Sequence, residues 1–154
     1  MVGCSVDKNT CQSDFTGALS DAETGLVGTW VLTDMVADKE VDLTDDGVEN
    51  PSTEIFDQLP DCQKDVEYTF DSDRSYMVRQ EYNAMDCTNK QTFNGTWSYS
   101  NGQLQVVSDC ILQTLNIEIS GDATTFTLVQ LITFNDVYGY MIKGNTTITY
   151  TKVL

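Results

Sequence analysis

The chain contains no histidine, and this absence removes the commonest parts of an enzyme active site. Histidine supplies the usual general base, the partner of serine and cysteine nucleophiles, and the most frequent metal ligand. The five cysteines show no Cys-x-x-Cys spacing, which argues against a zinc site. No pair among the 24 carboxylates has a spacing that singles it out as catalytic. We therefore predict that the protein is not an enzyme and holds no metal or cofactor.

Basic residues are also scarce, because eight lysines and arginines stand against 24 acidic residues and give a formal net charge of −16 at pH 7. So acidic a surface repels the phosphates of nucleic acids, which excludes them as partners. No apolar run reaches the roughly 18 residues that a membrane-spanning helix needs. The length of 154 residues fits one domain with its own core.

What the sequence does contain is a series of short alternating strands, with no pattern of a long helix. The first strand carries Gly28-Thr29-Trp30, and the same tripeptide returns at Gly95-Thr96-Trp97. A glycine lets a strand bend across the floor of a barrel while a large aromatic ring fills the bottom. Eight strands are predicted, at residues 26–36, 66–70, 76–82, 92–99, 103–107, 112–119, 124–134 and 140–152.

Eight strands close a barrel just wide enough for one small ligand. The predicted fold is therefore all-β, an eight-stranded antiparallel up-and-down barrel over residues 25–154. The polar residues 1–24 are predicted to form a flexible tether. A long acidic connection follows the first strand, and within it a short helix is predicted after Asn50-Pro51, through Ile55, Phe56 and Leu59.

Two further segments leave alternatives open. The strand at 124–134 is apolar on both faces, so its outward side chains, Val129 and Leu131, need a cover. The short helix, a partner protein and a second copy are the candidates. The run from Asp71 to Ser75 imitates the start of a calcium loop, but it lacks the loop's glycine and glutamate, so a turn is the better interpretation.

From Leu26 to its end the chain resembles the lipocalin-like domains of small bacterial surface lipoproteins, particularly those of Bacteroidota, within the lipocalin and fatty-acid-binding group. The residues that carry this resemblance are Gly28-Thr29-Trp30, Cys62-Gln63-Lys64-Asp65 leading to Tyr68-Thr69-Phe70, Asp71-Ser72-Asp73, and Gly95-Thr96-Trp97. The chain departs from that family at Arg74, where an Asp-Gly pair is common. The resemblance implies that Lys152 lies over the ring of Trp30 as a cation–π partner.

The cysteines point to an oxidising compartment. Val2-Gly3-Cys4 matches the end of a bacterial lipoprotein cleavage box, so Cys4 is expected to be lipidated; the alternative is a stray cysteine in a polar tail. Of the remaining four, Cys62 and Cys87 flank the predicted hairpin around Asp73-Arg74 and should face each other at its base as a disulfide. Cys11 with Cys110 follows only by elimination, and a free buried Cys110 is the alternative.

These observations predict an extracytoplasmic protein, either secreted or an outer-membrane lipoprotein, that binds a small, mostly apolar ligand. Membrane contact is expected only through the lipid on Cys4. The alternative is a non-catalytic accessory lipoprotein that docks on an outer-membrane protein. Trp30 is expected to plug the barrel, whereas Trp97 either plugs it or lines the cavity. The predicted ligand-binding residues are Tyr68, Phe70, Tyr76, Val78, Gln80, Tyr82, Trp97, Phe126, Leu128, Gln130 and Tyr140, with Gln80 or Gln130 available to orient the ligand.

Overall fold

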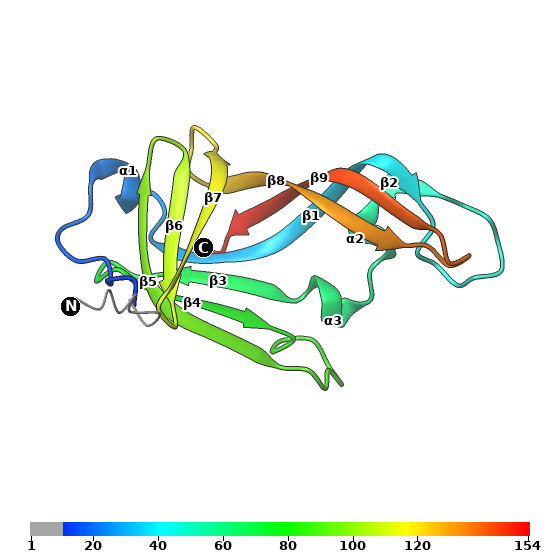
Figure 1. The fold of residues 1–154 in the computed structure, drawn as a ribbon, viewed down its shortest axis with the longest axis horizontal. Coiled ribbons are helices and arrows are strands. Elements are labelled where there is room, and N and C mark those ends of the chain that lie inside the picture. Colours follow the sequence, from blue (N-terminus) through cyan, green and yellow to red (C-terminus); the bar gives the residue numbers. More distant parts are fainter. Residues whose placement is uncertain (1–10) are drawn as a thin grey trace, which may run out of the picture.

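The computed structural model describes residues 11–154 as one antiparallel sheet closed into a barrel (Figure 1). Its elements are α1 (Asp21–Thr24), β1 (Gly28–Val41), β2 (Ser52–Glu54), α2 (Ile55–Gln58), α3 (Asp61–Lys64), β3 (Val66–Phe70), β4 (Ser75–Gln80), β5 (Gln91–Ser100), β6 (Gln103–Ser108), β7 (Ile111–Ile119), β8 (Thr125–Asn135) and β9 (Met141–Lys152). The strands follow one another around the barrel, and β1 closes it by pairing with both β3 and β9. This arrangement confirms the predicted eight-stranded up-and-down barrel, to which β2 adds a short strand along the far part of β1.

The barrel has a closed end, formed by the β3–β4, β5–β6 and β7–β8 turns together with the start of β1. Four aromatic side chains with almost no exposed surface fill it: Trp30, Phe70, Trp97 and Phe126. The Trp30 ring centroid lies 5.0 Å from that of Phe126, and the Trp97 centroid lies 5.3 Å from that of Phe70. Each indole also donates a hydrogen bond to a backbone carbonyl, Trp30 to Leu26 and Trp97 to Asp71. Both Gly-Thr-Trp tryptophans are therefore core plugs.

Gly28 explains why the first tripeptide begins with glycine. Its φ of +135° lies in a region that L side chains rarely adopt, and a Cβ there would come 3.0 Å from Cε of Lys152. Lys152 uses this space to place Nζ 5.0 Å from the centroid of Trp30 and to donate a hydrogen bond to the carbonyl of Gly25. The cation–π contact implied by the family resemblance is thus present.

Residues 11–24, which belong to the predicted flexible tether, lie against the barrel. A disulfide joins Cys11 to Cys110, and the backbone N–H of Phe15 donates to Oγ1 of Thr96 on β5. The segment ends in α1, where Ser20 and Glu23 form a reciprocal capping box. The composition of this stretch is polar, but specific contacts far along the chain hold it in place. Residues 1–10, including Cys4, lie outside the described residues.

Arg74 ties this N-terminal segment to the closed end. Its backbone has a φ of 71°, and its guanidinium forms a bidentate pair with the carboxylate of Glu23, at 2.9 and 3.1 Å. The remaining guanidinium N–H groups donate to the carbonyls of Gly17, Ala18 and Trp97. Arg74, the residue at which the chain departs from the family's turn pattern, therefore forms a buried ion pair. Each of its guanidinium N–H groups has an acceptor.

β1, β8 and β9 continue beyond the barrel and form an arm (residues 36–59 and 129–147) that projects to one side in Figure 1. A second small core lies within it, made of Ala37, Val41, Ile55 and Phe134. Of the three candidate covers for the outer face of β8, the short helix is not the one, because Ile55 of α2 packs on the inner face beside Phe134. Val129 and Leu131 consequently remain exposed on the outer face.

Several predicted boundaries also need correction. β1 continues to Val41 because its side chains go on alternating between the two faces of the sheet. Ala37 and Val41 belong to the second core. Asn50 does not cap a helix; its side chain donates to Asp46, and α2 begins only at Ile55 after β2. β4 ends at Gln80 because Glu81 has a φ of 64°, which breaks the alternation. Among the described residues, no helix has the length and apolar character needed to span a membrane.

Candidate functional site

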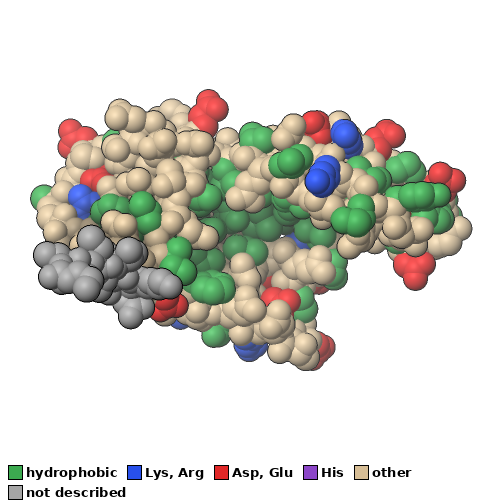
Figure 2. Space-filling view, viewed as in Figure 1, with side chains coloured by type: hydrophobic (Ala, Val, Ile, Leu, Met, Phe, Trp, Pro, Cys, Tyr) green, Lys and Arg blue, Asp and Glu red, His purple; other side chains and the backbone are tan. Residues whose placement is uncertain are grey.

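The open end of the barrel, opposite the closed end, contains a cavity of about 370 Å³. Its walls come from β3 to β7 and from the β6–β7 turn. Figure 2 shows a recess with hydrophobic side chains on its floor, between β5–β7 and the arm. The lining residues are Tyr68, Tyr76, Val78, Gln80, Phe93, Val106, Ser108, Asp109, Ile111, Gln113 and Leu115.

Antiparallel register brings these side chains together. Tyr68 pairs with Val78, which pairs in turn with Phe93, and directly opposed residues point to the same face of a sheet. On the other side, Val106 pairs with Gln113. The cavity wall is therefore the inward-facing set of five neighbouring strands.

Tyr76 lines the cavity where it meets the packed core, and Gly95 lies beside it. The two residues are paired across β4 and β5, and a Cβ on Gly95 would lie 2.8 Å from Cε1 of Tyr76. It would also lie 1.7 Å from the carbonyl oxygen of Val107, so a side chain at this position cannot fit. Glycine in the second tripeptide thus lets a neighbouring strand and an aromatic ring approach closely.

The two seams that border the arm explain why this end is open. β7 pairs with β8 only at residues 117–119, and β1 pairs with β3 only at residues 28–31. Beyond these short seams the strands separate, so inward-facing side chains meet solvent. Phe93 is 45% exposed and Ile111 is 65% exposed, although both point inward. An apolar surface of this kind is available to a ligand.

The polar groups of the cavity lie mainly on its rim. Gln80 and Gln113 come from β4 and β7, and Ser108 and Asp109 come from the β6–β7 turn. Asp109 and Cys110 have φ values of 49° and 67°, as a tight two-residue hairpin requires. The Cys11–Cys110 disulfide fixes this turn to the N-terminal segment. The disulfide thus holds the rim in place next to Asp109, the one charged residue among the described residues that line the cavity.

The tyrosines of the cavity stay protonated. Burial raises the pKa of Tyr76, a hydrogen bond with Ser108 offsets part of this rise, and the negative charge of Asp109 adds to it. Burial also raises the pKa of Tyr68, whose ring meets that of Tyr150 edge-on at 5.1 Å between centroids. These phenols therefore present neutral hydroxyls and apolar faces.

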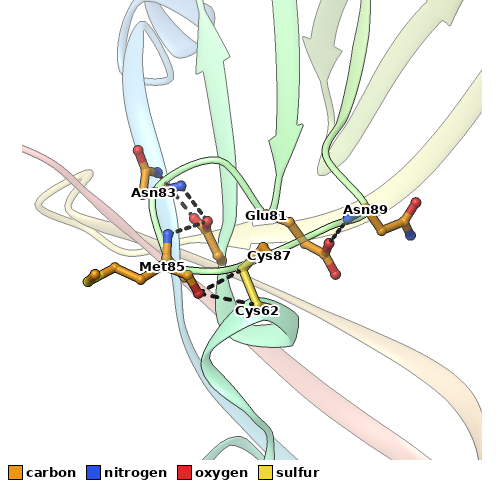
Figure 3. Close-up of a disulfide and its surroundings, with 8 residues drawn as sticks. Cys62, Glu81, Asn83, Met85, Cys87 and Asn89 are labelled. Carbon is orange, nitrogen blue, oxygen red and sulfur yellow. Dashed lines mark hydrogen bonds between the residues drawn. A yellow bond between two sulfur atoms is a disulfide. The ribbon is translucent and has the colours of Figure 1, made fainter.

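The second disulfide, Cys62–Cys87, joins α3 to the loop between β4 and β5 (Figure 3). The predicted pairing of these cysteines is confirmed, although both lie just beyond the strands rather than at the hairpin base. Asp65 supports the same loop by accepting hydrogen bonds from the backbone N–H groups of Asn83 and Ala84. The pairing of Cys11 with Cys110, reached by elimination, is present too. Among residues 11–154, no three cysteine or acidic side chains gather as a metal site requires.

A family model described as "Domain of unknown function (DUF5004)" matches residues 5–152. The chain belongs to this family. The closed eight-stranded barrel and the match over most of the chain fit a lipocalin-like fold. No curated protein matches the chain significantly.

In this DUF5004 chain, the predicted ligand-binding residues fall into three groups. Those in the cavity wall are Tyr68, Tyr76, Val78 and Gln80. Those packed in the core are Phe70, Trp97, Phe126 and Leu128. Those exposed away from the cavity are Tyr82, Gln130 and Tyr140.

The residues of the third group are displaced for identifiable reasons. Tyr82 follows the positive φ of Glu81 and lies outside, beneath the cations of Arg79 and Lys90. Gln130 shares the inward face of β8, but β7 no longer covers it there. Tyr140 precedes β9 at the tip of the arm and is 70% exposed.

The sequence interpretation missed the wall contributed by Phe93 and by the inward residues of β6 and β7. The signal was present as alternation, since Val106 on β6 and Gln113 and Leu115 on β7 occupy every second position of their strands. Alternation alone shows which side chains point inward. It does not show which of these are packed in the core and which line a cavity.

Proposed function

We propose that the protein is a non-enzymatic, extracytoplasmic lipocalin-like binder that holds a small, mostly apolar ligand at the open end of its barrel. The observation that carries this proposal is the cavity of about 370 Å³. Ligand pockets are typically concave, largely apolar and provided with a few polar groups. The aromatic and aliphatic walls, with Gln80 and Gln113 at the rim, have this composition.

The chemistry of the cavity supports binding rather than catalysis. Asp109 is the one charged residue in the wall that the structure describes, and no second carboxylate stands beside it there. A general acid–base pair needs two groups with separated pKa values within reach of one substrate. The tyrosines, whose pKa values are raised, do not act as bases near neutral pH.

The proposed location is the outer face of a bacterial membrane, with the protein tethered through a lipid on Cys4 in the manner of Bacteroidota surface lipoproteins, or secreted. Two disulfides within the described residues support an oxidising compartment. Intact-mass measurement of the protein purified from its own cells tests the tether, because acylation at Cys4 adds the mass of a diacylglyceryl group.

Binding is tested with a neutral, environment-sensitive apolar dye and the full chain. We expect saturable binding of one dye per molecule and displacement by small lipophilic compounds. Ile111→Asp places a carboxylate in the cavity wall and should weaken binding of the neutral dye severalfold, because a dye that packs on this side chain would remove part of the hydration of the carboxylate without supplying a partner. Leu131→Asp is the matched control, since both residues are 65% exposed on strands but Leu131 faces outward. Equal dye affinity for Ile111→Asp and Leu131→Asp would place the site elsewhere.

A second function is favoured by the outer face of β8. There Val129 and Leu131 are exposed side by side on one strand face, as in surfaces that dock a partner. In this alternative the protein is an accessory subunit of an outer-membrane assembly. Native mass spectrometry of the protein from its own cells separates the two: a retained small molecule favours the binder, whereas a protein partner that Leu131→Asp releases favours the accessory subunit.

A further inference from the structure

The charged side chains that line the cavity are of one sign, negative, among the residues that the structure describes. Asp109 lies at the β6–β7 turn, and its neighbours Ser108 and Ile111 are also in the wall. No lysine or arginine among the described residues lines the cavity. A ligand that enters this cavity therefore meets a negative charge at the rim and no positive one from the described wall.

The basic side chains near the barrel have other partners. Arg74 is buried in its pair with Glu23, and Lys152 lies over Trp30 at the closed end. Arg79 and Lys90 both lie over the outward ring of Tyr82. Because these contacts hold the cations at the closed end or on the outer surface, they do not offset the charge of Asp109 in the cavity.

The uncharged polar groups of the rim also favour a ligand that donates hydrogen bonds. The hydroxyl of Ser108 donates its proton to the carbonyl of Asn94 at 2.6 Å and is also hydrogen-bonded to the hydroxyl of Tyr76, so Ser108 has no proton left to donate to a ligand. The side-chain amides of Gln80 and Gln113 each offer an accepting oxygen as well as a donating NH₂ group. Acceptors therefore outweigh donors on the Asp109 side of the rim.

We propose that the cavity selects ligands by their head group, preferring an apolar body with an ammonium head to one with a hydroxyl head, and rejecting one with a carboxylate. The ammonium gains an ion pair with Asp109 and donates to Ser108. The carboxylate loses hydration beside a like charge, in the field of a chain with a formal net charge of −16. This selectivity rests on the proposed function, because it requires that the cavity bind a ligand at all.

The test is a competition against a neutral apolar dye by decylamine, decanol and decanoate, each below its critical micelle concentration, at low ionic strength. These compounds share one apolar body and differ in the head group. We expect the amine to compete best and the carboxylate worst, with about threefold between amine and alcohol, the size of an exposed ion pair. If none of the three displaces a bound dye, the proposed function fails. If decanoate competes as well as decylamine, the selectivity is overturned while binding stands.

Two substitutions assign the preference to Asp109 rather than to the net charge. Asp109→Asn removes the carboxylate but keeps a residue that tolerates the observed φ of 49°. Glu118→Gln removes one negative charge from the exposed outer face of β7. Asp109→Asn should bring the amine-to-alcohol ratio close to one, whereas Glu118→Gln should leave it unchanged. An equal loss in both variants would show that the net charge causes the preference and would overturn the assignment.

Discussion

The two ends of this barrel are held together by different forces. At the closed end, Trp30 and Trp97 pack against other aromatic rings, and the Glu23–Arg74 pair is buried with all its donors satisfied. At the open end the inward side chains surround a hollow, and two disulfides bind the adjoining turns and loops.

This contrast separates stability from binding within one sheet. A cavity forgoes the burial and dispersion that a packed core provides, so the structure around it needs support of another kind. Crosslinks restrict the open end without filling it. Substitutions at the closed end should therefore change stability, and substitutions at the open end should change ligand affinity.

The most damaging change is expected at Gly95, beside Tyr76 where the packed core meets the cavity. Gly95→Ala would place a Cβ 1.7 Å from the carbonyl oxygen of Val107, so β5 and β6 would have to separate. We expect a loss of at least about 4 kcal/mol in unfolding free energy, within the range of exceptionally severe substitutions. Denaturant melts measure it. Gly121→Ala is the control, because nothing lies within 4 Å of a Cβ there.

Trp97→Ala and Trp30→Ala should each cost about 3–5 kcal/mol, the usual effect of deleting a large buried aromatic side chain. Both rings are fully buried at the closed end. Because Trp97 is not in the cavity wall, we expect dye affinity to be preserved where the variant folds. A small loss of stability together with a large loss of affinity for Trp97→Ala would place that ring in the binding site instead.

The buried ion pair predicts a pH dependence. Burial alone would raise the pKa of Glu23, but hydrogen bonds from Arg74 and from the backbone of Ser20 and Tyr99 lower it from 4.5 to about 2. The stabilisation is therefore fully present above pH 4.5 and is lost as the pH falls toward 2.

Glu23→Gln tests this dependence. At neutral pH the variant should be less stable by about 3–5 kcal/mol, because Arg74 keeps a buried charge without its counter-ion. Its unfolding free energy should then decline less between pH 5 and 2 than that of the parent, roughly the range over which such a carboxylate titrates. Glu118→Gln, on the exposed surface, should leave the profile as it is; identical profiles for parent and Glu23→Gln would contradict the pairing.

The Cys62–Cys87 disulfide crosslinks the loops that adjoin the open end. Replacing both cysteines with serine should lower stability by about 3 kcal/mol, since the crosslink restricts the unfolded chain. We expect the affinity for the dye to fall. The emission spectrum of Trp30 and Trp97, which lie at the closed end, should stay as in the parent. Non-reducing peptide mapping of the parent verifies the bond, and a free Cys62 thiol would refute it.

Local pattern predicted the architecture because strand alternation and turn residues act over a few positions. All eight barrel strands, the Cys62–Cys87 bond and the Lys152–Trp30 contact followed from such patterns or from the family resemblance. The Glu23–Arg74 pair did not, because its members lie 51 residues apart and Arg74 reads as an ordinary turn residue.

The cavity was only partly predictable for a related reason. Its position depends on where β7 leaves β8, and the sequence of β8 alternates in the same way on both sides of that point. Leu128 and Gln130 share one face of that strand, yet Leu128 is packed and Gln130 is exposed. Pairing length between neighbours, a property of two strands together, decides between these outcomes.

The smallest change in stability is expected at Phe93, on the open side of the cavity. Phe93→Ser removes an aromatic side chain of the cavity wall that is 45% exposed. It should lower the unfolding free energy by about 1–2 kcal/mol, below the cost at Trp97, because only about half of the Phe93 side chain is buried. Dye affinity should nevertheless fall severalfold, since the ligand loses the face on which it packs. Equilibrium dye titration beside a denaturant melt measures both quantities on one sample. If Phe93→Ser destabilised the fold as much as Trp97→Ala does and left affinity unchanged, the open end would be part of the core, and the division between a supporting end and a binding end would fail.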